Sequence, residues 1–347
     1  MSPGDKATLR LAVGLGLAVL VAYGLDLAVP FVVCVLSVVV LSRPGPPVPL
    51  VKGLVVALLL AGLVAVGIAM VPLLEHYAFA GALLTAVVLH GLFYKGLVGG
   101  NPLSNVLVLS FALIPVAGVA EQALVGELSV ALATGVGVGV LVSAVSHALF
   151  PDPPPPADAI TKARLEPEAA AWIAVRATLI VMPVFVLALT DPSFYLAAVM
   201  KTVALGQQAE ETDARSAGGE LVGATLAGAA IAAGVWTGLS IWAGLWMLML
   251  WLVSAALWTG SAMFGVRHTR MRPAFWSNAL ITAFLLIGPA IEDSASGKSV
   301  IEGAVVRAGL FVAVAFYAWG MIRLLERRRA GLVREIPVRH RHHEEAT

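Results

Sequence analysis

Apolar residues fill long runs along this chain, and short polar or proline-containing stretches separate these runs. The runs are too long for buried strands and too uniformly apolar for surface helices, so they are typical of helices that cross a bilayer. About twelve such segments are predicted, six in each half of the chain. They cover residues 9–25, 29–41, 50–74, 79–94, 103–119, 124–150, 169–190, 193–205, 217–239, 241–264, 274–291 and 300–325.

The second half of the chain repeats the landmarks of the first half in the same order. The early landmarks are offset by about 166 residues and the later ones by about 173, a spacing that indicates an internal duplication. An even number of spans in each copy predicts parallel rather than inverted repeats. We therefore expect an all-α polytopic membrane protein made of two parallel six-helix repeats that face each other. The matched pairs are Arg10 with Arg176, Asp26 with Asp191, Asn105 with Asn278, and Pro115 with Pro289.

Four regions follow from this division of the chain. Residues 1–150 form the first repeat and residues 169–329 the second, while a proline-rich cytoplasmic linker occupies residues 151–168. Consecutive prolines favour an extended spacer, and the linker is too short for a domain. Residues 330–347 are expected to form a disordered cytoplasmic tail, because they are charged and lack large apolar runs.

Composition supports the membrane assignment and excludes several classes of function. With 59% hydrophobic and 12% charged residues, the chain has too little polar surface to coat a soluble globule. The net charge of +1 gives no indication of a nucleic-acid partner. The sequence contains no Walker motif, dinucleotide-binding loop or nucleophile elbow, so we expect neither an enzyme nor a cofactor or metal site. The apolar run after Lys6 and Arg10 has no small-residue cleavage site and is interpreted as a retained helix.

Basic residues predict the orientation in the membrane. If the spans alternate, almost every Lys and Arg falls on one side, and Lys298 alone falls on the other, together with Glu75, Glu121, Glu292 and Asp293. The positive-inside rule then places both termini in the cytoplasm of a bacterial inner membrane.

Two short segments identify the most promising region for a binding site. The second and eighth spans have only about 13 apolar residues against about 20 for a full crossing, and each begins beside a proline, Pro30 or Pro192. Short, proline-marked segments at matching places in two repeats are a sequence pointer to a transport site. Lys201 lies inside the eighth span, where it either meets an anionic substrate or snorkels towards the cytoplasm.

Other polar residues in the apolar runs complete the candidate substrate site. Arg307 lies within the last span, either as an anion ligand or paired with Glu302 five positions earlier. The duplicated Asn105 and Asn278 line a pathway or join neighbouring helices by hydrogen bonds. Gln207, at the end of the eighth span, is the fifth candidate.

Acidic residues are the candidates for proton coupling. Asp26 and Asp191 occupy equivalent hinges between the first two spans of each repeat. Each is either a proton carrier or a residue that caps the following helix and marks a turn. Glu220 and Glu302 are the next candidates, because both lie within apolar segments.

Several stretches resemble the fusaric-acid-resistance superfamily of aromatic-acid exporters, and more narrowly its compact branch of uncharacterised domains. The resemblance covers nearly the whole chain and is carried by RLAVGLGLAVLVAYGLDLAVPFVVCVLSVVVLSRPGPP, GGNPLSNVLVLSFALIPVAGV, HALFPDPPPP and RATLIVMPVFVLALTD. These are diffuse apolar patterns, which point to architecture more than to substrate. The chain departs from the larger exporters because it lacks the soluble cytosolic domain that usually follows each bundle.

The resemblance implies a proton-coupled inner-membrane exporter of small organic anions, aromatic carboxylates among them. It also implies a periplasmic membrane-fusion adaptor and an outer-membrane channel as partners, besides membrane lipid. Plant aluminium-activated malate channels are distant relatives of the superfamily, so a passive organic-anion channel is the alternative, and a non-transporting scaffold is a third. The oligomeric state is left open.

Overall fold

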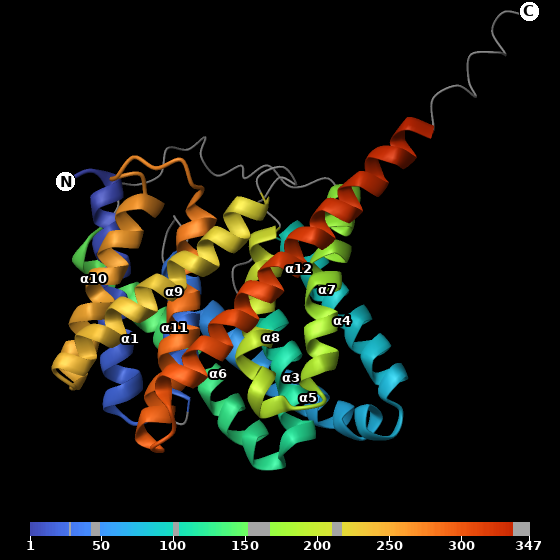
Figure 1. Cartoon of the computed structure of the whole chain (residues 1–347), viewed down its shortest axis with the longest axis horizontal. Coiled ribbons are helices and arrows are strands. Elements are labelled where there is room, and N and C mark those ends of the chain that lie inside the picture. Colours follow the sequence, from blue (N-terminus) through green and yellow to red (C-terminus); the bar gives the residue numbers. More distant parts are fainter. Residues whose placement is uncertain (28, 43–48, 100–103, 152–166, 210–216, 336–347) are drawn as a thin grey trace, which may run out of the picture.

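The chain folds into α-helices that pack in one body (Figure 1). The computed structural model describes residues 1–27, 29–42, 49–99, 104–151, 167–209 and 217–335. Within these residues there are twelve helices, as the apolar pattern predicts. Their bounds are α1 Pro3–Gly24, α2 Pro30–Leu41, α3 Leu50–His76, α4 Ala78–Gly99, α5 Ser104–Ala120, α6 Gln122–Leu149, α7 Pro167–Ala188, α8 Pro192–Ala209, α9 Ala217–Ile241, α10 Leu245–Met263, α11 Pro273–Ala295 and α12 Val300–Glu335.

Local sequence explains where several helices begin. Ser2 caps α1 by a capping box, in which its hydroxyl accepts from the Asp5 amide at 3.1 Å and its own amide donates to the Asp5 carboxylate at 2.8 Å. Proline occupies the first position of α2, α8 and α11, where its missing N–H costs nothing because that donor has no partner inside a helix.

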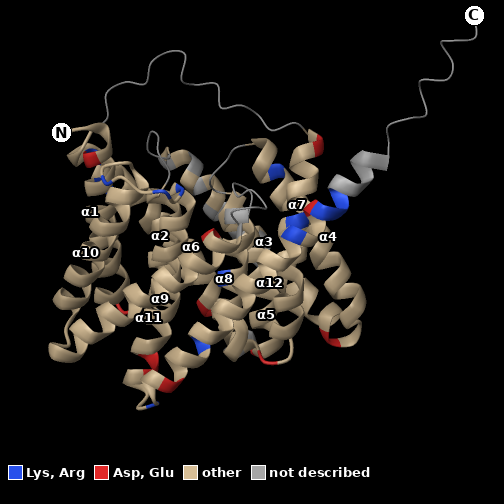
Figure 2. Ribbon diagram, turned by 45° about the horizontal axis from the view of Figure 1, so that its top comes forward, with Lys and Arg blue, Asp and Glu red and all other residues tan. Residues whose placement is uncertain are grey.

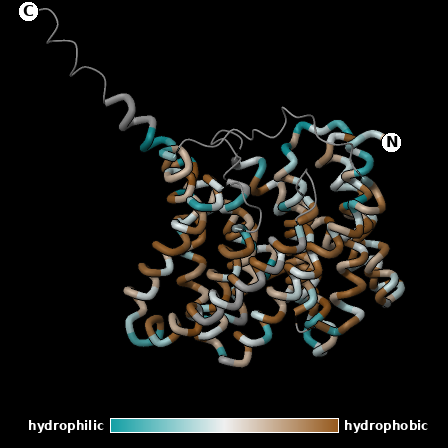
Figure 3. Tube along the Cα trace, turned by 180° about the vertical axis from the view of Figure 1, so that it is seen from behind, coloured by the Kyte–Doolittle hydropathy of each residue, from teal (hydrophilic) through white to brown (hydrophobic). Residues whose placement is uncertain are grey.

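Eight of the described helices are long and apolar enough to cross a membrane, and the protein is therefore a multi-pass membrane protein. They are α1, α4, α6, α7, α9, α10, α11 and α12. The tube in Figure 3 shows hydrophobic segments along the body of the bundle and hydrophilic ones at its ends. At 12 residues, α2 rises roughly 18 Å, well short of a hydrocarbon core about 30 Å thick.

The shortest helices lie at the centre of the fold. Ten of the 12 residues of α2 are buried, from Phe31 to Leu41, and α5 buries a continuous stretch from Val108 to Ala117. In the central layer α2 packs against α11, α11 against α8, and α8 against α5. Because longer helices surround this layer, a helix shorter than the bilayer is shielded from lipid.

Helices from the two halves of the chain interleave. α1 makes its most extensive contacts with α10, and α4 makes its most extensive contacts with α7. The body is therefore held together by packing between the halves as well as within them. Most of the predicted linker, residues 152–166, and most of the predicted tail, residues 336–347, lie outside the described residues. In the described part, α7 already begins at Pro167 and α12 continues to Glu335.

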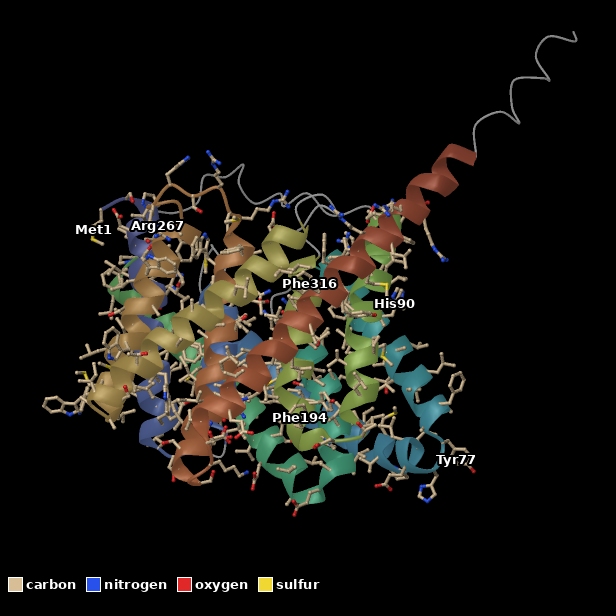
Figure 4. The ribbon with its side chains drawn as sticks, viewed as in Figure 1. Met1, Tyr77, His90, Phe194, Arg267 and Phe316 are labelled. Atoms are coloured by element: carbon tan, nitrogen blue, oxygen red, sulfur yellow. The ribbon has the colours of Figure 1, made fainter. Side chains whose placement is uncertain are left out.

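Charged residues gather at the two ends of the bundle. Figure 2 shows Lys and Arg concentrated on the face that holds the N-terminus and the end of α12. Hydrogen bonds join the start of α1 to the end of α6 on this face, because Lys6 and Arg10 donate to the carbonyls of Pro151 and Phe150. Figure 4 places Arg267 near Met1 on the same face, while Phe194 and Tyr77 lie toward the opposite face. We call these the basic face and the opposite face.

Candidate functional site

Lys201 is completely buried in the central layer. It belongs to α8 and has an exposed fraction of 0%. Its Nζ donates to the Asn278 Oδ1 at 2.7 Å and to the Thr282 Oγ1 at 2.6 Å, and both acceptors lie on α11. Lys201 therefore does not snorkel to an interface but joins α8 to α11.

The two acceptors are held in place by the geometry of α11. Asn278 and Thr282 are four residues apart, so their side chains lie on one face, one turn apart. The Thr282 hydroxyl donates to the Asn278 carbonyl at 2.6 Å. Because its single proton is used there, the Thr282 oxygen is left to accept from Lys201.

Gly228 of α9 packs directly against this cluster. A Cβ on Gly228 would lie 2.5 Å from the Ala279 carbonyl oxygen and 2.5 Å from the Thr282 Cβ, which real side chains do not tolerate. Only glycine permits this approach of α9 to α11. Gly228 therefore sets the position of Thr282.

The hydrogen-bond partners of Lys201 are neutral groups. Within the described residues, the hydrogen bonds of Lys201 go to an amide and a hydroxyl, and no carboxylate forms a salt bridge with it. An ammonium group has three donors, and two are used. A buried cation without a counter-ion is costly, and an anion that reaches it would relieve that cost.

A second polar contact joins α8 to the helix on its other side. The Gln207 Nε2 donates to the backbone carbonyl of Asn105 on α5 at 3.3 Å. α8 thus carries both Lys201 and Gln207 and is connected to both duplicated asparagines. The sequence singles out all four residues as candidates for the substrate site, but it does not predict that α8 connects them.

Arg307 does not join this cluster. Its guanidinium hydrogen-bonds to the Asp293 carboxylate near the end of α11, at the opposite face. Glu302, the alternative partner suggested by the sequence, is exposed, and the ion pair of Arg307 is with Asp293 instead. Arg307 therefore lies apart from Lys201 and Asn278, which meet nearer the start of α11.

The four acids proposed for proton coupling have different surroundings. Asp191 caps α8, because its Oδ1 accepts from the Phe194 amide at 3.2 Å. Asp26 is exposed, has a left-handed φ of 49°, and does not cap α2, whose N-cap residue is Val29. Glu220 is buried and pairs with Arg272 at 3.6 Å.

The residues that sequence reasoning missed gave weak signals or none. Thr282 follows Asn278 at helical spacing, so a search for polar residues one turn apart could have found it. From the sequence, Asp293 contributes only to the prediction of orientation, as one of the acidic residues on the side opposite most Lys and Arg. Arg10 and Arg176, a matched pair in the sequence, are both buried, and Arg176 donates to Glu326 at 3.1 Å.

The described residues contain no group of three or more His, Cys, Asp and Glu side chains that could hold a metal ion. Cys34, the chain's single cysteine, is buried in α2 among apolar residues.

Comparison with known families gives one match. A family model described as "Protein of unknown function (DUF2955)" matches residues 7–146. The first six helices resemble that family. No curated protein and no solved structure matches the chain.

Proposed function

We propose that this protein exports small organic anions across the bacterial inner membrane, and that Lys201 is the residue that attracts the anion. The observation that carries this proposal is the complete burial of the Lys201 ammonium group against neutral oxygens only. An ionisable group buried within an apolar membrane segment is by default a candidate for a substrate pathway. A carboxylate would replace Asn278 and Thr282 as the partner of Lys201.

Burial also favours a carrier over an open channel. Lys201 has no exposed surface, so an anion can reach it only after the helices around it move. Alternating access provides such a movement, whereas an open pore would leave the charged group in contact with water. A passive organic-anion channel is the alternative, and transport by the reconstituted protein distinguishes it from a carrier.

The pattern of helix packing supports an internal duplication. If α1–α6 correspond to α7–α12, the pair α1 and α10 corresponds to α7 and α4, and both pairs pack. In the same way α11 packs against α2, and α5 against α8. We infer two parallel six-helix repeats whose central helices α2, α5, α8 and α11 surround the transport pathway.

The two repeats differ in charge. Offsetting Lys201 by about 165 residues, as for the two hinge aspartates, reaches the apolar Leu36. The pathway is therefore symmetric in its helices and asymmetric in charge, with the cation supplied by α8.

Orientation and energy coupling complete the proposal. The basic face is cytoplasmic by the positive-inside rule. The resemblance to the fusaric-acid-resistance superfamily supplies proton coupling, the membrane-fusion adaptor and the outer-membrane channel. Asp26 is the first acid to test for coupling, because the described structure gives its side chain no capping hydrogen bond.

Reconstituted transport separates the carrier from the channel. The purified full chain in proteoliposomes should move benzoate against its concentration gradient when a proton gradient is imposed. A channel would pass benzoate only downhill and would show conductance without a proton gradient. Empty liposomes give the background of passive benzoic-acid permeation. No flux of benzoate or of other organic anions above that background would refute the proposed function.

A further inference from the structure

An apolar groove lies one helical turn from the Lys201 cluster. It runs between α9, α11 and α12 and has a volume of about 380 Å³. On α11 its wall includes Leu286, which lies one turn after Thr282 on the same side of the helix, and Ala290, one turn further along. On α9 its wall begins at Ala229, next to Gly228, the residue that packs against Thr282.

The opening of the groove lies toward the opposite face. Near the start of α9, Gly218 packs against Trp319 of α12, whereas the groove takes its α12 wall from the first turns of that helix, Val300 to Ala308, near the opposite face. Ile301 and Val305 of α12 line the groove and are 73% and 65% exposed, so they form its outer rim. The deep wall is buried, with Ala232 at 7% and Ala290 at 4% exposure.

The lining of the groove is selective for an uncharged group. Alanine, leucine, isoleucine, valine and tryptophan make up the wall except at Thr237. The Thr237 hydroxyl donates to the Ala233 carbonyl at 2.8 Å within α9. Its proton is therefore not offered to a ligand, and a second charge placed in the groove would remain uncompensated.

We propose that this groove binds the apolar body of the anion whose charged group is held by Lys201. This inference rests on the proposed function and adds the substrate class, an amphiphilic monoanion with one charged group and an apolar chain or ring. The volume falls within the range of about 300–1,000 Å³ that small-molecule sites occupy. The continuity of α11 from Asn278 through Thr282 to Leu286 and Ala290 places the charged and apolar ends of such a molecule along one helix.

Alkyl sulfonates of increasing length test this inference. Sulfonates remain ionised, so permeation of a neutral acid cannot imitate transport. Proteoliposomes with the full chain should transport hexanesulfonate with a lower half-saturating concentration than methanesulfonate. Ala232→Leu, which fills the deep wall, should raise that concentration about tenfold for hexanesulfonate and leave methanesulfonate unchanged. Ala230→Leu is the matched control, because exposed Ala230 lies on the same helix outside the groove and should change neither.

A second variant keeps the inference testable if Ala232→Leu fails to fold. Ile301→Trp narrows the groove from its exposed rim without entering the core, so it should fold and should weaken hexanesulfonate transport selectively. Unchanged selectivity in both variants, as expected if a lipid acyl chain fills the groove, overturns this inference but leaves the proposed function standing. Failure of the wild-type protein to transport either sulfonate or benzoate would refute the proposed function, and this inference with it.

Discussion

The Nζ of Lys201 donates to the Oδ1 of Asn278 at 2.7 Å, across 77 positions of sequence. This bond joins α8 to α11 in the middle of an apolar body. Its acceptor is neutral, so the contact satisfies a hydrogen bond of protonated Lys201 without supplying a counter-charge. The proposed attraction of an anion to Lys201 depends on that imbalance.

Orientation can be tested on the two loops that flank α11. Arg270 and Lys298 are both exposed, one before α11 and one after it. In a chain expressed in a bacterial inner membrane, we expect an impermeant maleimide to label Lys298→Cys in intact cells and Arg270→Cys only after lysis. The buried Cys34 should give little background. The reverse labelling pattern would invert the proposed topology.

Two glycines of α9 should respond in opposite ways to alanine. Gly228→Ala forces α9 away from Thr282 and should destabilise the protein by about 2 kcal/mol, with reduced transport. A Cβ on Gly234 would meet no heavy atom within 4 Å, so Gly234→Ala should stabilise α9 by about 0.5–1 kcal/mol. Thermal unfolding in detergent measures both effects, and equal shifts would show that the α9–α11 approach is not tight.

Arg307 and Asp293 should be coupled in stability. Each single change to alanine leaves a partly buried charge without its partner, so a double-mutant cycle should give a coupling of about 1–3 kcal/mol. Glu302→Gln is the control, since Glu302 is exposed and should have no effect. A coupling between Arg307 and Glu302 as large as that with Asp293 would restore the pairing expected from sequence.

The hinge aspartates should differ. Asp191→Asn keeps a side-chain oxygen for the Phe194 amide, so stability and transport should be unchanged, whereas Asp191→Ala should lose about 1 kcal/mol. Asp26→Asn should reduce uphill transport and leave downhill exchange intact, because asparagine cannot carry a proton. Normal uphill transport by Asp26→Asn would move the coupling role to another acid.

Sequence predicts the helices better than it predicts their partners. The twelve apolar runs correspond to the twelve described helices, but only eight of these are long and apolar enough to cross a membrane. For Lys201 the sequence left burial and snorkelling open, and the structure shows the side chain completely buried. The hydrogen bond to Thr282 could not be predicted, because a contact across 81 positions depends on how α8 and α11 pack.

The partner of Arg307 could not be read from local spacing. Glu302 was the nearest acid in sequence within the same span, but the loop between α11 and α12 brings Asp293 to the guanidinium instead. The two hinge aspartates show that a match in sequence does not ensure the same local structure. Asp26 and Asp191 match in sequence, yet only Asp191 caps a helix, since the turn after α1 places Val29 at the N-cap of α2.

The most direct test of the role of Lys201 is the flux of an organic anion through Lys201→Met in proteoliposomes. Methionine keeps an unbranched side chain of similar length and removes the charge, so the variant should insert and elute from size exclusion like the wild-type protein. We predict that benzoate and methanesulfonate flux both fall about tenfold or more, because the ammonium group that attracts the anion is gone. Wild-type flux of both anions through correctly inserted Lys201→Met would contradict this role.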